Sequence, residues 1–372
     1  MIKERGSLTP GFDRRFPELK GFDYVEFYVG NALQAAHFYR SACGFKLVAR
    51  AGLETGVRDH VSIVLEQNQI RLVVTSAQGP DSSIARHVST HGDSVKDVAF
   101  LVEDVKKAFD QLVANGARPV AEPALFQDDH GFIHKATVAA YGDTVHSLVQ
   151  RDAYRGPFFH GFQAVAGRAG GNQIGLCNID HIAVCAEAGK LSELVAFYRE
   201  VFGFHESHHE DVASEYSAMN SKVVQDAAGR IKFPIVEPAP KKGRSQIDEF
   251  LSYHYGPGVQ HLAMLSDDII NSVRSLKANE IEFLRTPGSY YEALADRVGE
   301  TGIDREAIRE LGILVDRDEW GYLMQTFTKP LHNRPTVFLE IIQRKAARGF
   351  GAGNIKALFE ALEREQLRRG NL

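Results

Sequence analysis

Hydrophobic and polar positions alternate in the same way at two distant places in the chain. Residues 22–27 (FDYVEF) and 179–184 (IDHIAV) both have the period of two that is typical of a half-buried strand. Each is followed by a helical stretch that ends in the tripeptide Phe-Tyr-Arg, at 38–40 and 197–199. A glycine follows each helix, Gly44 and Gly203, and glycine suits the left-handed position after a helix. The pattern therefore predicts two copies of one strand–helix unit.

The similarity continues along both copies. Residues 92–99 parallel residues 256–263, and the predicted closing strands are 146–151 and 339–344. In each copy, an acidic turn and a predicted helix lie between these two segments, at 104–114 in the first copy and 267–278 in the second. The repeat predicts an α+β fold of tandem βαβββ modules, in which curved sheets have helices outside and surround a pocket. The predicted organisation is an N-terminal extension (1–20), a first domain (21–155), a linker (156–175) and a second domain (176–372).

Only the second copy carries a set of metal-ligand side chains. They are His181, His261 and Glu340, whereas the equivalent positions in the first copy hold Tyr24, Asp97 and Ser147. Two histidines and one carboxylate can bind one face of a ferrous ion and leave positions for a substrate and O2. Zinc hydrolases use the same ligand types, so the three residues alone leave zinc open.

Glu340 lies in the apolar segment 336–342, where a carboxylate is costly to bury unless it is paired or bound to a metal. The alternative to a metal is an ion pair with Arg344 or Arg334. Each histidine, taken alone, is also compatible with a structural role. The metal prediction therefore depends on the three residues occurring together at repeat-equivalent sites.

Composition narrows the class of protein. Hydrophobic residues make up 44% and charged residues 24%, which is typical of a folded globular chain. The net charge of −5, without a basic block, argues against a nucleic acid or an anionic membrane as the main partner. Three cysteines without CxxC spacing argue against a disulfide framework and favour a reducing compartment. With no signal-peptide pattern and no long apolar stretch, we expect a cytoplasmic protein.

Four segments are distinctive: 245–249 (SQIDE), 258–261 (GVQH), 325–330 (QTFTKP) and 349–360 (GFGAGNIKALFE). Through them the chain, from about Gly21 onward, resembles the 4-hydroxyphenylpyruvate dioxygenase family of the vicinal oxygen chelate superfamily. The resemblance implies two curved-sheet open barrels and an Fe(II) ion held by His181, His261 and Glu340. It also implies an aryl 2-oxo acid that chelates the iron, O2 as co-substrate, release of CO2, and a homo-oligomer, dimer or tetramer.

The resemblance also implies a substrate pocket. Its residues are Ser217, Pro234, Val236, Gln246, Gln260, Gln325, Phe327, Phe338, Phe350 and Ile355. The implied gate is Gly351, Gly353 and Asn354, followed by a C-terminal helix that closes over the site. From the sequence itself, Asn354 is a suitable N-cap for that helix, and apolar residues at 355, 358, 359 and 362 form one face.

Two positions bear on the product. Homogentisate-forming members of the family usually carry asparagine and phenylalanine where this chain has Val236 and Ile355, and 4-hydroxymandelate synthases carry aliphatic residues there. We expect conversion of 4-hydroxyphenylpyruvate to homogentisate, as in tyrosine catabolism, with 4-hydroxymandelate as the alternative product. Two other classes stay open: an extradiol-type dioxygenase and a non-catalytic ligand-binding module of the same fold.

Overall fold

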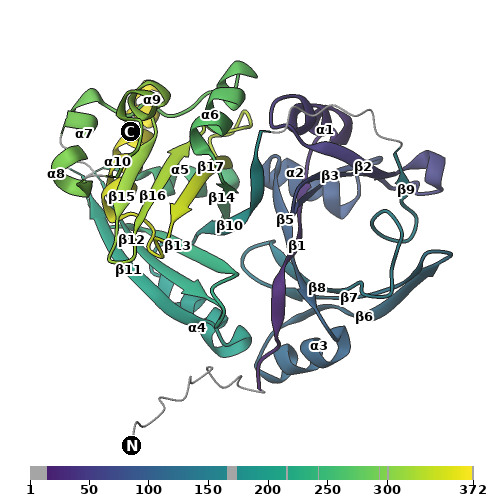
Figure 1. Ribbon diagram of the computed structural model, residues 1–372. Coiled ribbons are helices and arrows are strands. Elements are labelled where there is room, and N and C mark those ends of the chain that lie inside the picture. Colours follow the sequence, from purple (N-terminus) through teal and green to yellow (C-terminus); the bar gives the residue numbers. More distant parts are fainter. Residues whose placement is uncertain are drawn as a thin grey trace, which may run out of the picture.

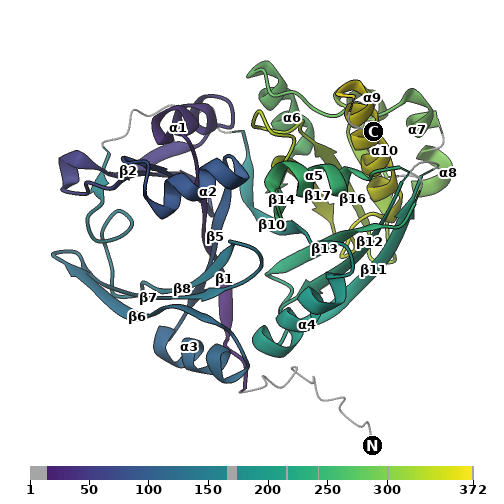
Figure 2. The same cartoon turned by 180° about the vertical axis from the view of Figure 1, so that it is seen from behind.

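A computed structural model describes residues 15–165, 174–214, 217–241, 243–292, 294–299 and 301–370. Residues 1–14 of the predicted extension and 166–173 of the predicted linker lie outside the described residues. Figure 1 shows two halves side by side, each built on one curved sheet flanked by helices, and Figure 2 shows the same arrangement from behind. The predicted fold class is confirmed.

The first half contains one sheet with strand order β6-β7-β8-β5-β1-β4-β3-β2-β9. Its elements are β1 (Leu19–Tyr28), α1 (Ala32–Ser41), β2 (Lys46–Ala51), the 3-10 turn η1 (Leu53–Thr55), β3 (His60–Gln67), β4 (Ile70–Ala77), α2 (Ser83–His91), β5 (Ser94–Val102), α3 (Val105–Ala114), β6 (Pro119–Asp128), β7 (Gly131–Ala139), β8 (Val145–Gln150) and β9 (Gln163–Ala164).

The second half contains a sheet with strand order β11-β12-β13-β10-β14-β17-β16-β15. Its elements are β10 (Leu176–Cys185), α4 (Leu191–Phe202), β11 (His205–Ala213), β12 (Ala218–Gln225), β13 (Lys232–Ala239), α5 (Gln246–His254), β14 (Gly258–Ser266), α6 (Ile269–Ala278), α7 (Gly288–Glu292), α8 (Leu294–Val298), α9 (Arg305–Leu311), β15 (Leu314–Arg317), β16 (Tyr322–Phe327), β17 (Phe338–Lys345) and α10 (Ala352–Arg368). No helix among the described residues is long and apolar enough to cross a membrane.

The strand register confirms the internal repeat residue by residue. In the first half, β1 pairs antiparallel with β5 and places Tyr24 opposite Ala99. In the second half, β10 pairs antiparallel with β14 and places His181 opposite Ala263. Both pairs contain bulges at three equivalent places, and a bulge redirects the side chains beside it. The two copies therefore present equivalent positions to the inside of their sheets.

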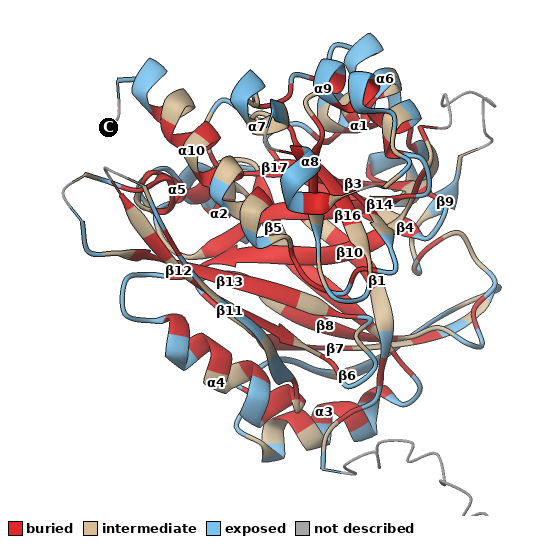
Figure 3. Ribbon diagram, turned by 60° about the vertical axis from the view of Figure 1, so that its left-hand side comes forward, coloured by how far each residue is buried: buried red, intermediate tan, exposed pale blue. Residues whose placement is uncertain are grey.

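Local sequence explains where two equivalent helices begin, and apolar packing joins the two halves. Equivalent helices start at equivalent caps: Ser82 before α2 and Ser245 before α5 each accept a backbone N–H with their side chains. Figure 3 shows that the central strands are buried while the outer faces of the helices are exposed. The main apolar core includes residues of both halves, such as Phe100 and Phe233, whose rings lie 6.2 Å apart. The two sheets thus share one core.

The C-terminal helix closes the second sheet. α10 contacts β11 and β15, which are the two edge strands of that sheet, and it also contacts α5. A curved sheet whose edges are bridged in this way becomes an enclosed space rather than an open groove. The expected closing helix is therefore present, and it covers the concave side from which the central strands β10, β14 and β17 present their side chains.

Candidate metal centre and pocket

The three predicted ligands converge on neighbouring strands at the centre of the second sheet. His181 lies on β10, His261 on β14 and Glu340 on β17, and all three are buried. The Nε2 atoms of His181 and His261 lie 3.2 and 3.4 Å from Oε2 of Glu340. One ligand atom from each residue lies within 4.8 Å of the others, which is the spacing of a single-ion site.

The alternative partners proposed for Glu340 are engaged elsewhere. Arg344 donates two hydrogen bonds to Asp180, at 2.7 and 2.8 Å. Arg334 donates to the backbone carbonyls of Ser89, Thr90 and Tyr253. Glu340 instead contacts the two histidines and accepts a hydrogen bond from the side-chain amide of Gln325. An ion pair with arginine does not account for this buried carboxylate.

Each histidine is held by its other ring nitrogen. Nδ1 of His181 lies 2.8 Å from Oδ1 of Asp180, and Nδ1 of His261 lies 3.1 Å from Oε1 of Gln260. Both partners are acceptors, so Nδ1 is the protonated nitrogen in each ring. The unprotonated Nε2 atoms then face the Glu340 carboxylate, as metal-bound histidines do. Two nitrogen lone pairs and one carboxylate fit a ferrous or zinc ion.

The charges of the site are strongly coupled. Burial alone would raise the pKa of Glu340, but the charge of His181 and hydrogen bonds with both histidines outweigh it and hold the pKa at about 2. Burial lowers the pKa of His261 despite that carboxylate. Burial also disfavours charge on His181, but Glu340 and Asp180 outweigh it and raise its pKa. The buried Glu340 carboxylate therefore favours positive charge at its two histidine neighbours.

A hydrogen-bond chain joins the carboxylate ligand to the C-terminal helix. Nε2 of Gln325 donates to Oε1 of Glu340 at 2.8 Å, and Nδ2 of Asn354 donates to Oε1 of Gln325 at 2.9 Å. The hydroxyl of Tyr290 then donates to Oδ1 of Asn354 at 2.6 Å. Through these hydrogen bonds, Asn354 on α10 helps to orient the Glu340 carboxylate. The position of α10 over the pocket and the geometry of the ligand therefore depend on each other.

The prediction that Asn354 caps this helix is wrong. α10 begins at Ala352, with Gly351 as its N-cap, so the helix starts three residues earlier than predicted and Asn354 is fully buried within its first turn. The backbone N–H of Gly353 is bound instead by the carboxylate of Asp316, at 2.9 Å. That acceptor comes from β15, so the side chain of Asn354 is free to bind Gln325.

A small apolar cavity lies above the three ligands. Its volume is about 60 Å³. Eight of the predicted substrate residues line this cavity: Pro234, Val236, Gln246, Gln260, Gln325, Phe327, Phe350 and Ile355. The predictions missed six further lining residues: Ala183, Met219, Ser221, Val223, Leu358 and Phe359. Several of these are inward positions of β10 and β12, so strand alternation was a signal that could have found them.

Two predicted pocket residues lie just outside the cavity lining. The hydroxyl of Ser217 donates to Glu363 of α10, and the side chain is fully buried. Phe338 packs against the ring of His261, with centroids 4.9 Å apart. Both therefore support the helix or a ligand rather than face the cavity.

The predicted gate residue Gly351 lies directly against the hydrogen-bond chain. It has a φ of +76°, and a Cβ atom at this position would lie 2.8 Å from Oε1 of Gln325.

The equivalent site of the first half holds a lysine in place of a metal. The hydroxyls of Tyr24 and Ser147 donate to Oδ2 of Asp97, at 2.8 and 2.6 Å. Nζ of Lys135 donates to the hydroxyl of Tyr24 at 2.6 Å and lies 3.6 Å from the same Asp97 oxygen. The three residues that correspond to the ligands thus still meet, and an ammonium group supplies the positive charge.

An ion-paired aspartate next to the first residue of each site is also repeated in the two halves. Asp23 is bound by Arg151 and Arg71, as Asp180 is bound by Arg344 and Lys232. Each arginine lies under an aromatic ring, with Arg151 5.4 Å from Phe158 and Arg344 5.4 Å from Phe350. The first half therefore preserves the supports of the site but not its ligands.

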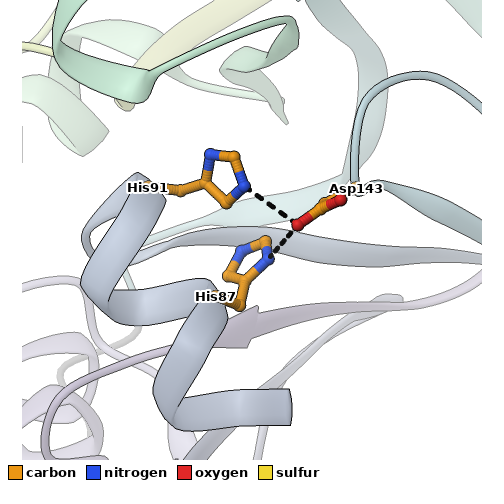
Figure 4. Close-up of side chains that lie close together, drawn as sticks. All are labelled: His87, His91 and Asp143. Atoms are coloured by element: carbon orange, nitrogen blue, oxygen red, sulfur yellow. Dashed lines mark hydrogen bonds and ion pairs between the residues drawn. The ribbon is translucent and has the colours of Figure 1, made fainter.

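A second histidine cluster was not anticipated. His87 and His91 on α2 turn their rings toward the carboxylate of Asp143, in the loop between β7 and β8 (Figure 4). The spacing of four residues between the histidines was a visible signal, since it places both on one face of a helix. Asp143 could not be connected to them from sequence, because only the fold brings its loop to α2.

Comparisons with known proteins agree with this architecture. The model of the glyoxalase/bleomycin resistance protein/dioxygenase superfamily matches residues 21–149 and 178–325. A 4-hydroxyphenylpyruvate dioxygenase of Yarrowia lipolytica is 43% identical, with 95% of this chain and 94% of that protein covered. One from Dictyostelium discoideum is 42% identical, with 95% and 100% covered. The solved structure of a mutant 4-hydroxymandelate synthase from Streptomyces coelicolor matches with a TM-score of 0.85 and 42% identity, covering 94% of this chain and 99% of that one.

Proposed function

Since this chain belongs to the 4-hydroxyphenylpyruvate dioxygenase family of the glyoxalase/bleomycin resistance protein/dioxygenase superfamily, we propose that it converts 4-hydroxyphenylpyruvate and O2 to homogentisate and CO2. The observation that carries the proposal is the convergence of His181, His261 and Glu340 under an apolar cavity closed by α10. An extradiol-type dioxygenase is disfavoured by the family membership and by the glutamines of the pocket, and a non-catalytic binding module by the ligand set.

The cofactor we propose is Fe(II), held by Nε2 of His181, Nε2 of His261 and a carboxylate oxygen of Glu340. When bound, Fe(II) supplies a chelation site for the 2-oxo acid and the redox chemistry that O2 requires. Asp180 and Gln260 keep the protons of the two rings on Nδ1, so both Nε2 lone pairs stay available. Gln325 and Asn354 fix the rotation of the carboxylate.

The glutamines are placed to orient the substrate. Nε2 of Gln260 donates to Oε1 of Gln246 at 2.8 Å. The amide nitrogen of Gln246 donates to Sδ of Met219, 3.8 Å away, and a thioether is a weak acceptor. We propose that this N–H donates to an oxygen of the bound substrate. Phe327, Phe350 and Phe359 supply apolar walls that hold an aryl ring and exclude water.

A second product, 4-hydroxymandelate, is supported by two lining residues. Val236 and Ile355 belong to the same apolar cluster and both line the cavity. An aliphatic pair there gives no hydrogen bond and no aromatic face to the substrate ring, so the ring can tilt. A hydrogen bond contributes about 1 kcal/mol, and about 1.4 kcal/mol between two barriers changes a product ratio tenfold. The match to the solved structure of a mutant 4-hydroxymandelate synthase agrees with this alternative.

Product analysis decides between the two. Purified protein would be incubated with Fe(II), ascorbate, O2 and 4-hydroxyphenylpyruvate, and the product identified by mass and retention time. We expect homogentisate, and 4-hydroxymandelate as the sole product would replace our first choice by the second. Formation of neither, with no CO2 released, would reject both.

A ligand variant tests the metal role. Glu340→Ala should lose iron binding and CO2 release together, whereas Ser147→Ala, at the equivalent position of the first half, should keep both. Loss of iron with continued release of CO2 by Glu340→Ala would contradict the oxygenase proposal. Three expectations stay predictions: the domain boundaries, the cytoplasmic location, and a homo-oligomer that is a dimer or a tetramer. Light scattering on the purified protein would measure the oligomeric state.

A further inference from the structure

The second histidine cluster lies where the two halves meet. His87 and His91 are one turn apart on α2, and both are buried, while the side chain of Asp143 is 61% exposed. Oδ2 of Asp143 lies 3.1 Å from Nε2 of His91 and 3.9 Å from Nδ1 of His87. Figure 4 shows both rings directed at this one oxygen. One ligand atom from each residue lies within 4.8 Å of the others.

The protonation of His91 follows from its neighbours. Its Nδ1 lies 2.6 Å from the backbone carbonyl oxygen of His254, which can only accept, so Nδ1 carries the hydrogen. In the neutral ring, Nε2 then presents a lone pair to a carboxylate oxygen 3.1 Å away. Two acceptors at that separation repel each other unless a cation lies between or beside them.

His87 is in the same situation. Its Nε2 lies 2.9 Å from Oγ of Ser94, and that hydroxyl donates to the carbonyl of Gly92. Ser94 therefore accepts from Nε2–H, and Nδ1 is left unprotonated. This Nδ1 is buried and has no hydrogen-bond partner among the described residues. An unpaired buried nitrogen is unfavourable, and here it points at the same oxygen that faces His91.

We propose that Nδ1 of His87, Nε2 of His91 and Oδ2 of Asp143 bind a divalent metal ion of the zinc type, with water as the fourth ligand. A tetrahedral zinc site with bonds of about 2.0–2.1 Å places its ligand atoms about 3.3 Å apart, and the two measured separations lie on either side of that value. A backbone carbonyl and a serine hydroxyl hold the opposite ring nitrogens, as in known zinc sites. A proton on His91 would satisfy Asp143 but leave His87 unpaired, whereas a metal engages all three.

The charges nearby allow such an ion but limit its affinity. Lys96 donates to the backbone carbonyl of Asp143 rather than to its carboxylate. Arg334 donates to the backbone carbonyls of Ser89 and Thr90 at the end of α2. Both cations oppose a bound metal, and the exposed side of Asp143 provides a path for exchange with solvent. We therefore expect reversible binding rather than a permanently occupied site.

The ion would connect the first half to a wall of the pocket. It would join α2 to the loop before β8 and fix the ring of His91, which stacks on His254 with centroids 4.5 Å apart. His254 is the last residue of α5, and the first residue of α5 is Gln246, which lines the cavity. A metal here would thus act as a structural tie across the shared core, independent of the reaction at Glu340.

The test separates the two sites by variant. Metal-free protein would be titrated with Zn²⁺ by calorimetry and with Co²⁺ by visible absorption, as wild type, Asp143→Asn, Glu340→Gln and the double variant. We expect two equivalents for wild type, one for each single variant and none for the double variant. Loss of an outer partner weakens a metal site by about 10–100-fold, so replacement of a ligand should weaken it by about 100-fold or more.

The variants remain interpretable if one fails to fold. Asp143→Asn replaces an exposed side chain by one of the same shape, so it leaves the buried packing intact. His87→Gln is a second variant, which removes the proposed ligand on α2. Because Glu340→Gln isolates the new site, its result stands whether or not the proposed dioxygenase activity is found. One equivalent in wild type, or two equivalents retained in Asp143→Asn and His87→Gln, would overturn the proposal. If NMR shows that His91 is protonated and no metal binds, a proton rather than a metal ion joins His91 to Asp143, and the proposal is overturned.

Discussion

Substitution of Asp180 by asparagine should weaken both the fold and the metal site. The carboxylate holds His181 at 2.8 Å and accepts two hydrogen bonds from Arg344, with Lys232 3.6 Å away. Its side chain is 4% exposed and that of Arg344 is 13% exposed. Loss of one charge from a buried pair costs about 3–5 kcal/mol, because the other charge stays buried without compensation. Asparagine keeps one acceptor, so we expect the lower end of that range.

The repeat supplies a matched control. Asp23→Asn breaks the same arrangement in the first half, where Arg151 and Arg71 hold the carboxylate and the side chains of Asp23 and Arg151 are 3% and 17% exposed. We expect a similar loss of stability from the two variants. Only Asp180→Asn should also lower metal affinity, by about 10–100-fold, because Asp180 orients a ligand and Asp23 does not.

Two measurements decide the matter. Denaturant unfolding of both metal-free variants gives the cost in stability, and calorimetric titration with Fe(II) under anaerobic conditions gives the affinity. The reasoning is refuted if Asp180→Asn is as stable as wild type. It is also refuted if the two variants lose metal affinity equally, since that would make the effect on the metal a general consequence of a weakened core.

Three further predictions concern the pocket and its ligands. Ile355→Phe should move the product ratio toward homogentisate by about tenfold, as measured by quantitative chromatography, since an aromatic wall restricts the tilt of the ring. Metal affinity should fall as pH falls through the raised pKa of His181, because the proton that pairs with Glu340 in the metal-free protein occupies the ligand nitrogen; an affinity independent of pH between 5 and 8 would contradict this. Asn354→Ala should lower kcat more than it changes KM, because it leaves Gln325 without its amide partner, at a cost of about 1–3 kcal/mol.

The repeat and the ligand set could be predicted from sequence because both follow from local pattern. Strand alternation places His181 and Tyr24 at the same inward position, and the register in the structure agrees. Strand positions are predictable in this way because one face of each strand is fixed by the core. The eight predicted pocket residues that line the cavity were implied by the family resemblance and not by strand alternation.

What could not be predicted depends on contacts between distant segments. The cap of α10 is supplied by Asp316 rather than by Asn354, because β15 ends beside Gly353. Lys135 occupies the cation position of the first half, and Asp143 meets α2, only after the sheets have formed. A local rule named a residue only for the cap, and in all three cases a side chain from a distant strand or loop provides the interaction.

Lys135 has a consequence for the order in which the protein is made. The first half carries its positive charge on its own strand β7, so its inner polar cluster is complete once the chain has been synthesised through β9. The second half needs Glu340, on β17, and a metal from solution before its equivalent cluster is complete. Domains fold as units during synthesis, from the N-terminus onward. The lysine therefore lets the inner polar cluster of the first half form from residues of that half alone, before β17 has been synthesised.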